Sequence, residues 1–124
     1  MTKVKEREKT KELADCIIEA MQEKMAQDIV VIDFSELSNM IADYFIICHA
    51  GSSPQMEAIA DAIERKTRTA LKSRPWSHEG FENKEWMLLD YVDVVVHIFR
   101  EDRRQFYNIE GLWADAIIKK IDQE

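Results

Sequence analysis

The sequence predicts an α/β fold, a single-domain sandwich in which helices cover a mixed β-sheet, with the element order α-β-β-α-β-β-α. Segments with helical spacing of apolar residues alternate along the chain with short β-branched runs, which is typical of this class. The length of 124 residues suits one core, and 46% hydrophobic with 33% charged residues is a globular balance. We therefore expect residues 1–124 to form one domain, with residues 1–6 as a frayed N-terminus.

The first part of the chain predicts one helix and two strands. A helix is expected over residues 5–26, and residues 28–33 and 44–49 are short apolar runs that favour buried strands. The segment between the two strands is too short for a helical crossover, so we expect them to pair antiparallel. The buried face of the helix would consist of Leu13, Cys16, Ile17, Ala20 and Met21.

A second helix is expected after the turn at Gly51. Ser53 is a natural N-cap, and Pro54 suits the first helical position, where its missing N–H costs nothing. The helix would end near Pro75 and form the crossover between the second and third strands. Its buried stripe would consist of Met56, Ile59, Ala60, Ile63, Thr67, Ala70 and Leu71.

The last part of the chain predicts a hairpin and a third helix. Residues 75–84 are interpreted as a loop, and residues 86–91 and 94–99 as two strands joined by a tight turn at Val92 and Asp93.

The third helix is expected to begin near Arg103 or Ile109 and to run to about Ile121. Its inward face would hold Leu112, Trp113, Ala116, Ile117 and Ile121.

The sequence carries no sign of a membrane segment or of disulfide bonds. No apolar run approaches the ~18–20 residues that a membrane span needs, and the charged N-terminus lacks the apolar core of a secretory signal. Cys16 and Cys48 are far apart, match no metal-ligand spacing and are interpreted as buried, reduced thiols. We expect a cytoplasmic protein with no membrane partner.

The formal net charge of −7 argues against a broad nucleic-acid face, which calls for a basic surface. Acidic residues dominate two segments, residues 28–55 and 76–97, and their complementary partner would be a basic protein or a cation. Outside the N-terminus, positive charge gathers at Arg65, Lys66, Arg68, Lys72 and Arg74.

Three polar features have both a chemical and a structural interpretation. Carboxylates close together could bind a metal or share a proton, but acids at strand ends also cap turns. The turn at Gly51 precedes a helix N-terminus, yet it is neither a phosphate-binding loop nor a dinucleotide fingerprint. His97 lies in an apolar strand without companion ligands nearby, so no cofactor and no metal are predicted. The acids are Asp33, Asp43, Asp90 and Asp93.

Aromatic residues gather in the last third of the chain, interleaved with acids. Trp86 and Tyr91 bracket a predicted strand, and exposed aromatics beside acids are common interface anchors. From their positions alone, these two side chains fit a core and an interface equally well.

Several short motifs follow one another between Asp33 and Leu112-Trp113, with Glu110 before the last, and the resemblance they carry covers about Leu13 to Ile117, nearly the whole chain. They are Ala42-Asp43-Tyr44-Phe45-Ile46, Gly51-Ser52-Ser53-Pro54-Gln55, His78-Glu79-Gly80, Trp86-Met87-Leu88-Leu89-Asp90-Tyr91, Asp93-Val94-Val95-Val96-His97 and Arg104-Gln105-Phe106-Tyr107. Each motif alone is modest, but together they are highly specific. In this set the chain resembles the ribosomal silencing factor (RsfS), or Iojap, family.

The resemblance implies a regulatory protein rather than an enzyme, with a fold similar to the nucleotidyltransferase superfamily. The implied partner is the large ribosomal subunit, bound through its ribosomal protein fourteen, so that joining of the small subunit is blocked and translation is repressed. A role in large-subunit assembly is an alternative. On this basis the expected partner-binding residues are His78, Glu79, Glu82, Trp86, Asp90, Tyr91 and Asp93.

One departure from the family pattern concerns the hairpin turn. Val92 stands where the family usually has Gly, and a β-branched residue does not easily adopt a positive φ. We therefore expect the turn to use another geometry.

Two rival functions remain. A nucleotidyltransferase would need two carboxylates one residue apart on a strand, and neither Asp61 with Glu64 nor Asp90 with Asp93 has that spacing. A self-associating protein is the second rival, because the apolar strand at residues 94–99 would suit a homodimer at a sheet edge or face.

Overall fold

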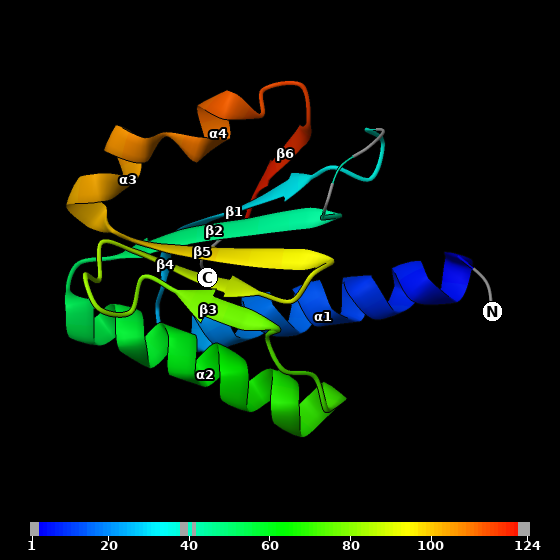
Figure 1. Cartoon of the computed structure of the whole chain (residues 1–124), viewed down its shortest axis with the longest axis horizontal. Helices are drawn as coiled ribbons and strands as arrows, with labels where there is room; N and C mark the ends of the chain where they lie inside the picture. The colour runs from blue at the N-terminus through cyan, green and yellow to red at the C-terminus, as the bar shows by residue number, and fades with distance from the viewer. Residues whose placement is uncertain (1–2, 38–39, 41, 122–124) are drawn as a thin grey trace.

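The computed structural model describes residues 3–37, 40 and 42–121, and it confirms the α/β class with a mixed sheet. Helices cover the sheet on both sides: α1 and α2 lie on one side, and α3 and α4 lie on the other (Figure 1). The elements are α1 (Lys3–Glu23), β1 (Gln27–Asp33), β2 (Tyr44–Ala50), α2 (Ser53–Leu71), β3 (Ser77–Glu79), β4 (Trp86–Asp90), β5 (Val94–Arg100), α3 (Glu101–Tyr107), α4 (Ile109–Leu112) and β6 (Ile117–Lys120).

The six strands form one sheet in the order β3-β4-β5-β2-β1-β6. β1 and β2 pair antiparallel, as predicted from their short connection. β2 and β5 pair parallel, and the remaining neighbours pair antiparallel. Helix α2 begins the connection between these two parallel strands, as expected of a crossover helix, but the parallel partner of β2 is the fourth predicted strand and not the third.

Apolar side chains fill both sides of the sheet. The larger cluster lies between the sheet and the pair α1 and α2, and it includes fully buried Ile17, Ile46 and Ile63. The smaller cluster lies under α3 and α4 and includes Phe34 and Phe99. Cys16 and Cys48 are both buried and free, as predicted.

The start of α2 differs from the prediction by one residue. Ser52, not Ser53, is the N-cap: its backbone is extended, and its side chain accepts a hydrogen bond from the Gln55 N–H. Pro54 remains in the first turn. The predicted stripe is buried except for Ala70, which is exposed, and Leu71, which is half-buried.

The C-terminal region contradicts the prediction of one long helix. The chain forms two short helices separated by Asn108, whose φ of 45° is a left-handed conformation that asparagine tolerates. The stretch that begins with Ile117 and Ile118 then returns as β6, paired with β1. Helical spacing and β-branching conflict in this segment, and strand pairing prevails.

Two further predictions need correction. The segment interpreted as a loop contains β3, which pairs with β4, so the real order adds β3 and β6 to the predicted elements. Helix α1 already begins at Lys3, within the residues expected to fray, while residues 1 and 2 lie outside the described range.

The turn between β4 and β5 also contradicts the prediction. Val92 does adopt a positive φ, of 74°. The Asp93 N–H donates to the Tyr91 carbonyl at 3.0 Å, which closes a γ-turn around Val92. The Asp90 side chain accepts the Val92 N–H at 2.8 Å. These two hydrogen bonds hold a valine in a conformation that normally favours glycine.

Across the described part of the chain, no helix combines the length and the apolar character needed to cross a membrane.

Candidate partner-binding face

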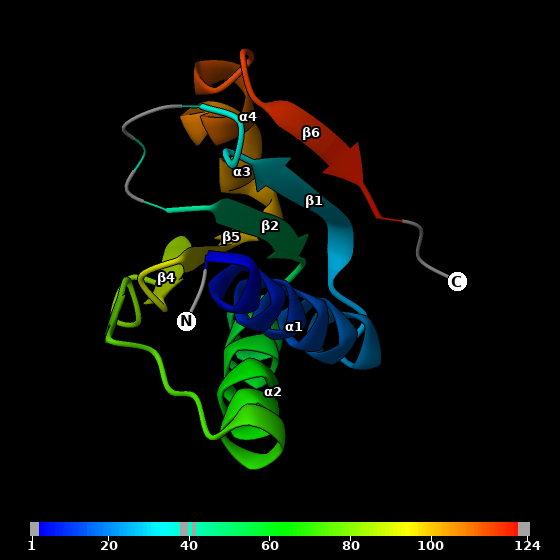
Figure 2. The same cartoon turned by 90° about the vertical axis from the view of Figure 1, so that its right-hand side faces the viewer.

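Strands β3, β4 and β5 leave part of one sheet surface outside the cover of the helices. Figure 2 shows α3 and α4 standing above β1 and β2, with β4 to the side of them. On β4, alternation turns Trp86, Leu88 and Asp90 toward this side, while Met87 and Leu89 are buried toward the larger core. We call this surface the open face; it consists of Ser77, Glu79, Trp86, Leu88, Asp90 and Val95, all at least partly exposed.

Trp86 lies at the end of the open face nearest α3. Its ring stacks on Phe99 with centroids 5.2 Å apart and contacts Tyr107 at 4.8 Å. Its indole Nε1–H donates a 3.0 Å hydrogen bond to His97 Nδ1. Trp86 is therefore half-buried and oriented by three neighbours, as an interface anchor needs to be.

The turn before β4 requires glycine. Gly80 has a φ of +82°, and an added Cβ would lie 1.9 Å from the Trp86 carbonyl oxygen. The backbones of Gly80 and Trp86 can approach only because no side chain stands between them. This contact fixes where β4 begins and thus where the Trp86 side chain lies.

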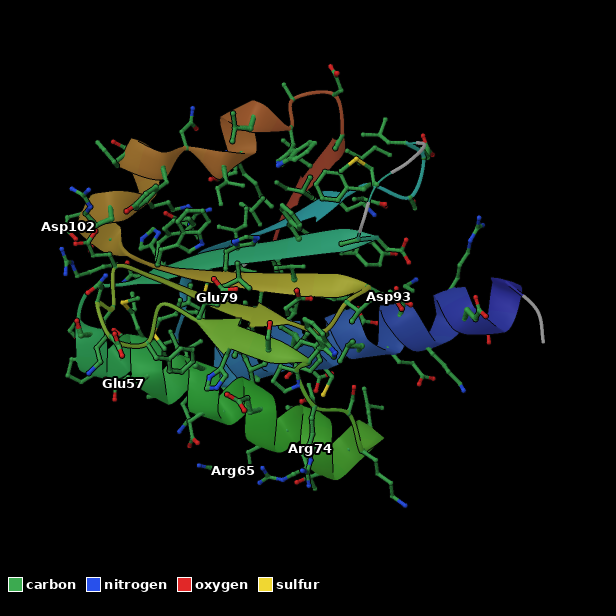
Figure 3. The ribbon with its side chains drawn as sticks, viewed as in Figure 1. Glu57, Arg65, Arg74, Glu79, Asp93 and Asp102 are labelled. Carbon is green, nitrogen blue, oxygen red and sulfur yellow. The ribbon has the colours of Figure 1, made fainter. Side chains whose placement is uncertain are left out.

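Acids surround the open face and the hairpin beside it. Glu79 lies beside the edge strands and Asp93 lies at the hairpin end of β5 (Figure 3). Asp43 and Tyr44 both donate their N–H groups to the Asp93 carbonyl, which brings two acidic residues together. Burial raises the pKa of Asp43, and the Asp93 carboxylate raises it further.

The four acids singled out from the sequence do not form a metal site, although Asp33 and Asp93 both raise the pKa of Asp43. Asp33 accepts the Ser35 N–H and Asp90 accepts the Val92 N–H, which are turn-capping roles. Among the described residues, no three His, Cys, Asp or Glu side chains come together as a metal site would require.

The predicted contact residues divide into two groups. Trp86, Asp90, Asp93, Glu79, Glu82 and His78 are all at least partly exposed.

Tyr91 corrects the prediction of an exposed anchor. It is buried in the larger core, and its hydroxyl lies 2.9 Å from Thr67 Oγ1 on α2. Burial raises its pKa to about 12. Little of this side chain is therefore exposed to a partner in the folded chain.

Sequence reasoning did not count four side chains on or near the open face among the expected contact residues. Leu88 and Val95 lie on the open face, Tyr107 contacts Trp86, and Phe106 is 69% exposed against Tyr107. The parity of residues 86, 88 and 90 on one strand was the signal that marks Leu88. The position of α3 carries no comparable signal in the sequence.

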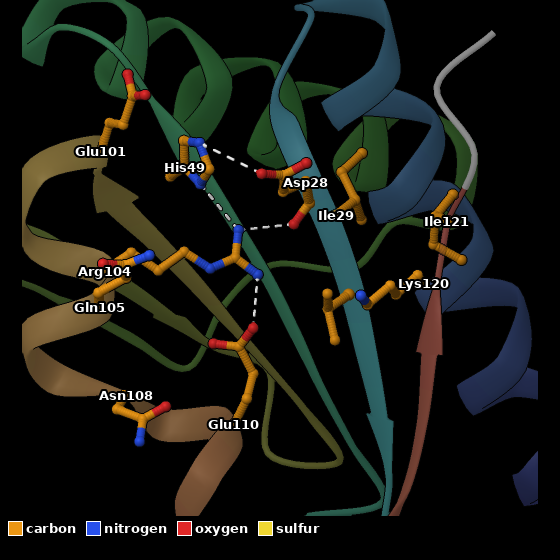
Figure 4. A pocket seen from close by; sticks show the side chains of 11 residues that line it. Asp28, Ile29, His49, Glu101, Arg104, Gln105, Asn108, Glu110, Lys120 and Ile121 are labelled. Atoms are coloured by element: carbon orange, nitrogen blue, oxygen red, sulfur yellow. Dashed lines mark hydrogen bonds and ion pairs between the residues drawn. The ribbon is translucent and has the colours of Figure 1, made fainter.

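A separate hollow of about 830 Å³ lies between α3, α4 and strands β1 and β6. Buried Arg104 forms its floor: Nη1 donates to the Asp28 carbonyl at 2.7 Å and to His49 Nδ1 at 2.9 Å, and Nη2 donates to Glu110 at 2.9 Å (Figure 4). Burial, and then the Arg104 charge, lowers the pKa of His49. These groups bond one another, so their visible role is to join α3 and α4 to the sheet.

Comparisons with known proteins agree with the resemblance seen in the motifs. The family model described as "Ribosomal silencing factor during starvation" matches residues 7–124. The chain is 40% identical to the ribosomal silencing factor RsfS of Bacillus subtilis over 104 residues, which is 83% of this chain and 86% of that protein. It is 39% identical to RsfS of Halalkalibacterium halodurans over 105 residues, with 85% and 88% covered.

A solved structure agrees as well. A crystal structure of a Chromobacterium violaceum protein superposes with a TM-score of 0.78 at 33% identity, and covers 84% of this chain and 85% of that one. The chain belongs to the ribosomal silencing factor family.

Proposed function

We propose that this protein represses translation in the cytoplasm by binding ribosomal protein fourteen of the large ribosomal subunit and blocking association with the small subunit. The family and the names of its relatives, ribosomal silencing factors, support a regulatory role at the ribosome. The partner and the block of subunit joining are our proposal for this chain.

The observation that carries the proposal is the open face. Trp86 supplies a preorganised aromatic anchor, and Leu88 and Val95 extend it with apolar surface. A desolvated aromatic centre surrounded by polar groups is the usual arrangement of a protein interface.

The charge of this region sets the kind of partner. Glu79, Asp90 and Asp93 lie on or beside the open face, and the whole chain carries a formal net charge of −7. An acidic rim favours a basic protein by speeding encounter and setting orientation. A ribosomal protein that is itself basic meets this requirement.

No catalysis is needed for such a block. A domain about 30 Å across, placed on a surface where the two subunits meet, excludes the second subunit by steric overlap alone.

Sedimentation of purified subunits tests the proposal. The protein should travel with the large subunit and, in the presence of magnesium, should keep the small subunit from joining it. Trp86→Ala should lose both effects, while a matched change away from the open face, Lys119→Ala on β6, should keep them. Sedimentation with the small subunit only, or normal joining at saturating protein, would contradict the proposal.

The assembly-factor alternative uses the same surface, and differs in which particle is bound. A factor for assembly would bind immature large subunits more tightly than mature ones. Sedimentation of the protein with each kind of particle distinguishes the assembly role from silencing. The nucleotidyltransferase alternative predicts nucleoside triphosphate binding in the presence of magnesium, which calorimetry measures directly.

The homodimer alternative loses its argument for the sheet edge, while pairing through the sheet face stays a prediction. Strand β5 lies between β4 and β2 in the interior of the sheet, so its edges are not free to pair with a second copy. Light scattering of the isolated chain would detect a dimer formed through another surface.

A further inference from the structure

We infer that the end of α2 and the segment that follows it form a second contact surface, which takes a single-stranded RNA segment. Arg68, Arg74 and Trp76 line one hollow of about 550 Å³, together with Pro75, His78 and Glu64. This hollow adjoins the open face, since Ser77 belongs to both, and its two arginines reverse the acidic character of that surface. The identification of this RNA as ribosomal rests on the proposed function. The binding of single-stranded RNA in this hollow does not depend on it.

The two arginines are free to bind an anion. Most arginines in the described residues have a carboxylate partner, as Arg65 has in Asp61 and Arg103 has in Glu85. Within the described part of the chain, Arg68 and Arg74 have no carboxylate within ion-pair distance, although Glu64 lines the same hollow. Arginine with unpaired donors is the preferred partner of a phosphate group.

Trp76 provides the surface on which a base can stack. Its side chain is 78% exposed, the largest exposed fraction among the large hydrophobic residues of the described chain. Exposing a large apolar indole ring to water is unfavourable. Stacking of a nucleic-acid base covers the ring, and it is favourable for any of the four bases.

The backbone around Trp76 is fixed, although the side chain is exposed. The Trp76 N–H donates to the Asp90 carbonyl at 2.6 Å, and the Ser73 N–H donates to the Thr67 carbonyl at 3.1 Å. Lys72 ends α2 in a left-handed conformation with φ of 54°. An aromatic ring on a rigid backbone loses little entropy on binding.

The placement of charge favours RNA over an acidic protein. Figure 3 shows Arg65 and Arg74 on the α2 side of the molecule, away from Asp102 on α3. Two arginines beside one exposed indole match the alternation of phosphate and base along a nucleic acid strand. The hydrogen bond from Trp76 to Asp90 places this hollow next to the open face, so a basic protein and an RNA strand could be held side by side.

The inference agrees with the charge argument from the sequence. A net charge of −7 opposes a broad phosphate-binding face, and the hollow offers a local one.

Fluorescence anisotropy of a short labelled oligouridylate, with the full chain at about 50 mM salt, tests the inference. Binding should quench tryptophan fluorescence and should weaken as salt is raised. Trp76→Ala should weaken it about fivefold or more, and Trp76→Phe should keep most of the affinity but lose the quenching. The double variant Arg68→Glu with Arg74→Glu should lower the affinity for oligouridylate about tenfold or more.

The control carries the same change of charge elsewhere. Lys119→Glu with Lys120→Glu, on the exposed strand β6, should bind oligouridylate as the parent does apart from a small uniform loss. Equal loss in the two double variants, no binding at low salt, or equal binding of polyglutamate or anionic vesicles would overturn the inference. Trp86→Ala separates the two surfaces, because it should lose the large subunit and keep the oligouridylate.

Discussion

The indole Nε1–H of Trp86 donates to Nδ1 of His97 across the β4–β5 pair at 3.0 Å. Because the indole nitrogen is only a donor, His97 must present an unprotonated Nδ1 and carry its proton on Nε2. That Nε2 is buried and has no hydrogen-bond partner among the described residues. A core histidine therefore orients the tryptophan that we propose as the anchor.

Trp86→Ala is expected to weaken binding to the large subunit by roughly 2 kcal/mol or more, about thirtyfold. The loss follows from removal of the ring that stacks on Phe99 and Tyr107 at the open face. Trp86→Phe keeps a ring and loses the His97 hydrogen bond with part of the ring area, so it should cost less. An unchanged dissociation constant in folded Trp86→Ala would remove this residue from the interface.

Stability should fall on acidification because of His97. Burial lowers its pKa to about 4, so between that value and the unfolded pKa near 6.5 the unfolded chain binds more protons than the folded one. From about pH 7 to pH 5 this should cost about 2 kcal/mol, measured by urea unfolding.

His97→Gln is the matched variant, since it can still accept the indole hydrogen bond without titrating. Its pH dependence should be shallower than that of the parent. Some slope should remain, because the pKa of His49 is also lowered by burial. Identical slopes in both proteins would assign the effect to other groups.

The alternation of side chains along a strand predicts that Trp86 and Tyr91 differ in exposure. Trp86 and Tyr91 are an odd number of residues apart, so one strand must turn them to opposite sides, one open and one buried. The γ-turn at Val92 could not be predicted from the sequence, because valine disfavours a positive φ. Strand β6 was not predicted, because the apolar residues of this segment have helical spacing. The segment is a strand because it pairs with β1.

Asp90→Asn separates charge from turn geometry. The amide oxygen can still accept the Val92 N–H, so stability should change little, while the loss of one negative charge at the open face weakens attraction to a basic partner. We expect a lower association rate, with a smaller effect at high salt. Asp90→Lys should lose stability as well, because it also removes the acceptor. Equal association rates at low salt would argue against an electrostatic role.

Val92→Gly should stabilise the fold by about 1 kcal/mol. A valine in the left-handed region costs about 1–3 kcal/mol, and the glycine returns part of that through a more flexible unfolded chain. Val92 is 52% exposed, so little burial is lost. Val92→Ala keeps a Cβ and should not reproduce the gain. A lower melting temperature for the glycine variant would show that this turn is not strained.

Arg104→Ala should destabilise the chain by about 2 kcal/mol or more, because three acceptors lose a charged donor at once. His49 and the Asp28 carbonyl lie on β2 and β1, while Glu110 lies on α4, so the guanidinium joins the C-terminal helices to the sheet. The loss should appear in urea unfolding and as faster hydrogen exchange in α3 and α4.

Arg100→Ala is the control for Arg104. Arg100 forms a hydrogen-bonded ion pair with Asp102, but Arg100 is only half-buried and Asp102 is exposed, so its removal should cost less stability than that of buried Arg104. If the two variants lose equal stability, burial of Arg104 adds nothing to the attachment of the helices. If Arg104→Ala alone loosens α3, it should also weaken binding at the open face, because Tyr107 on that helix contacts Trp86.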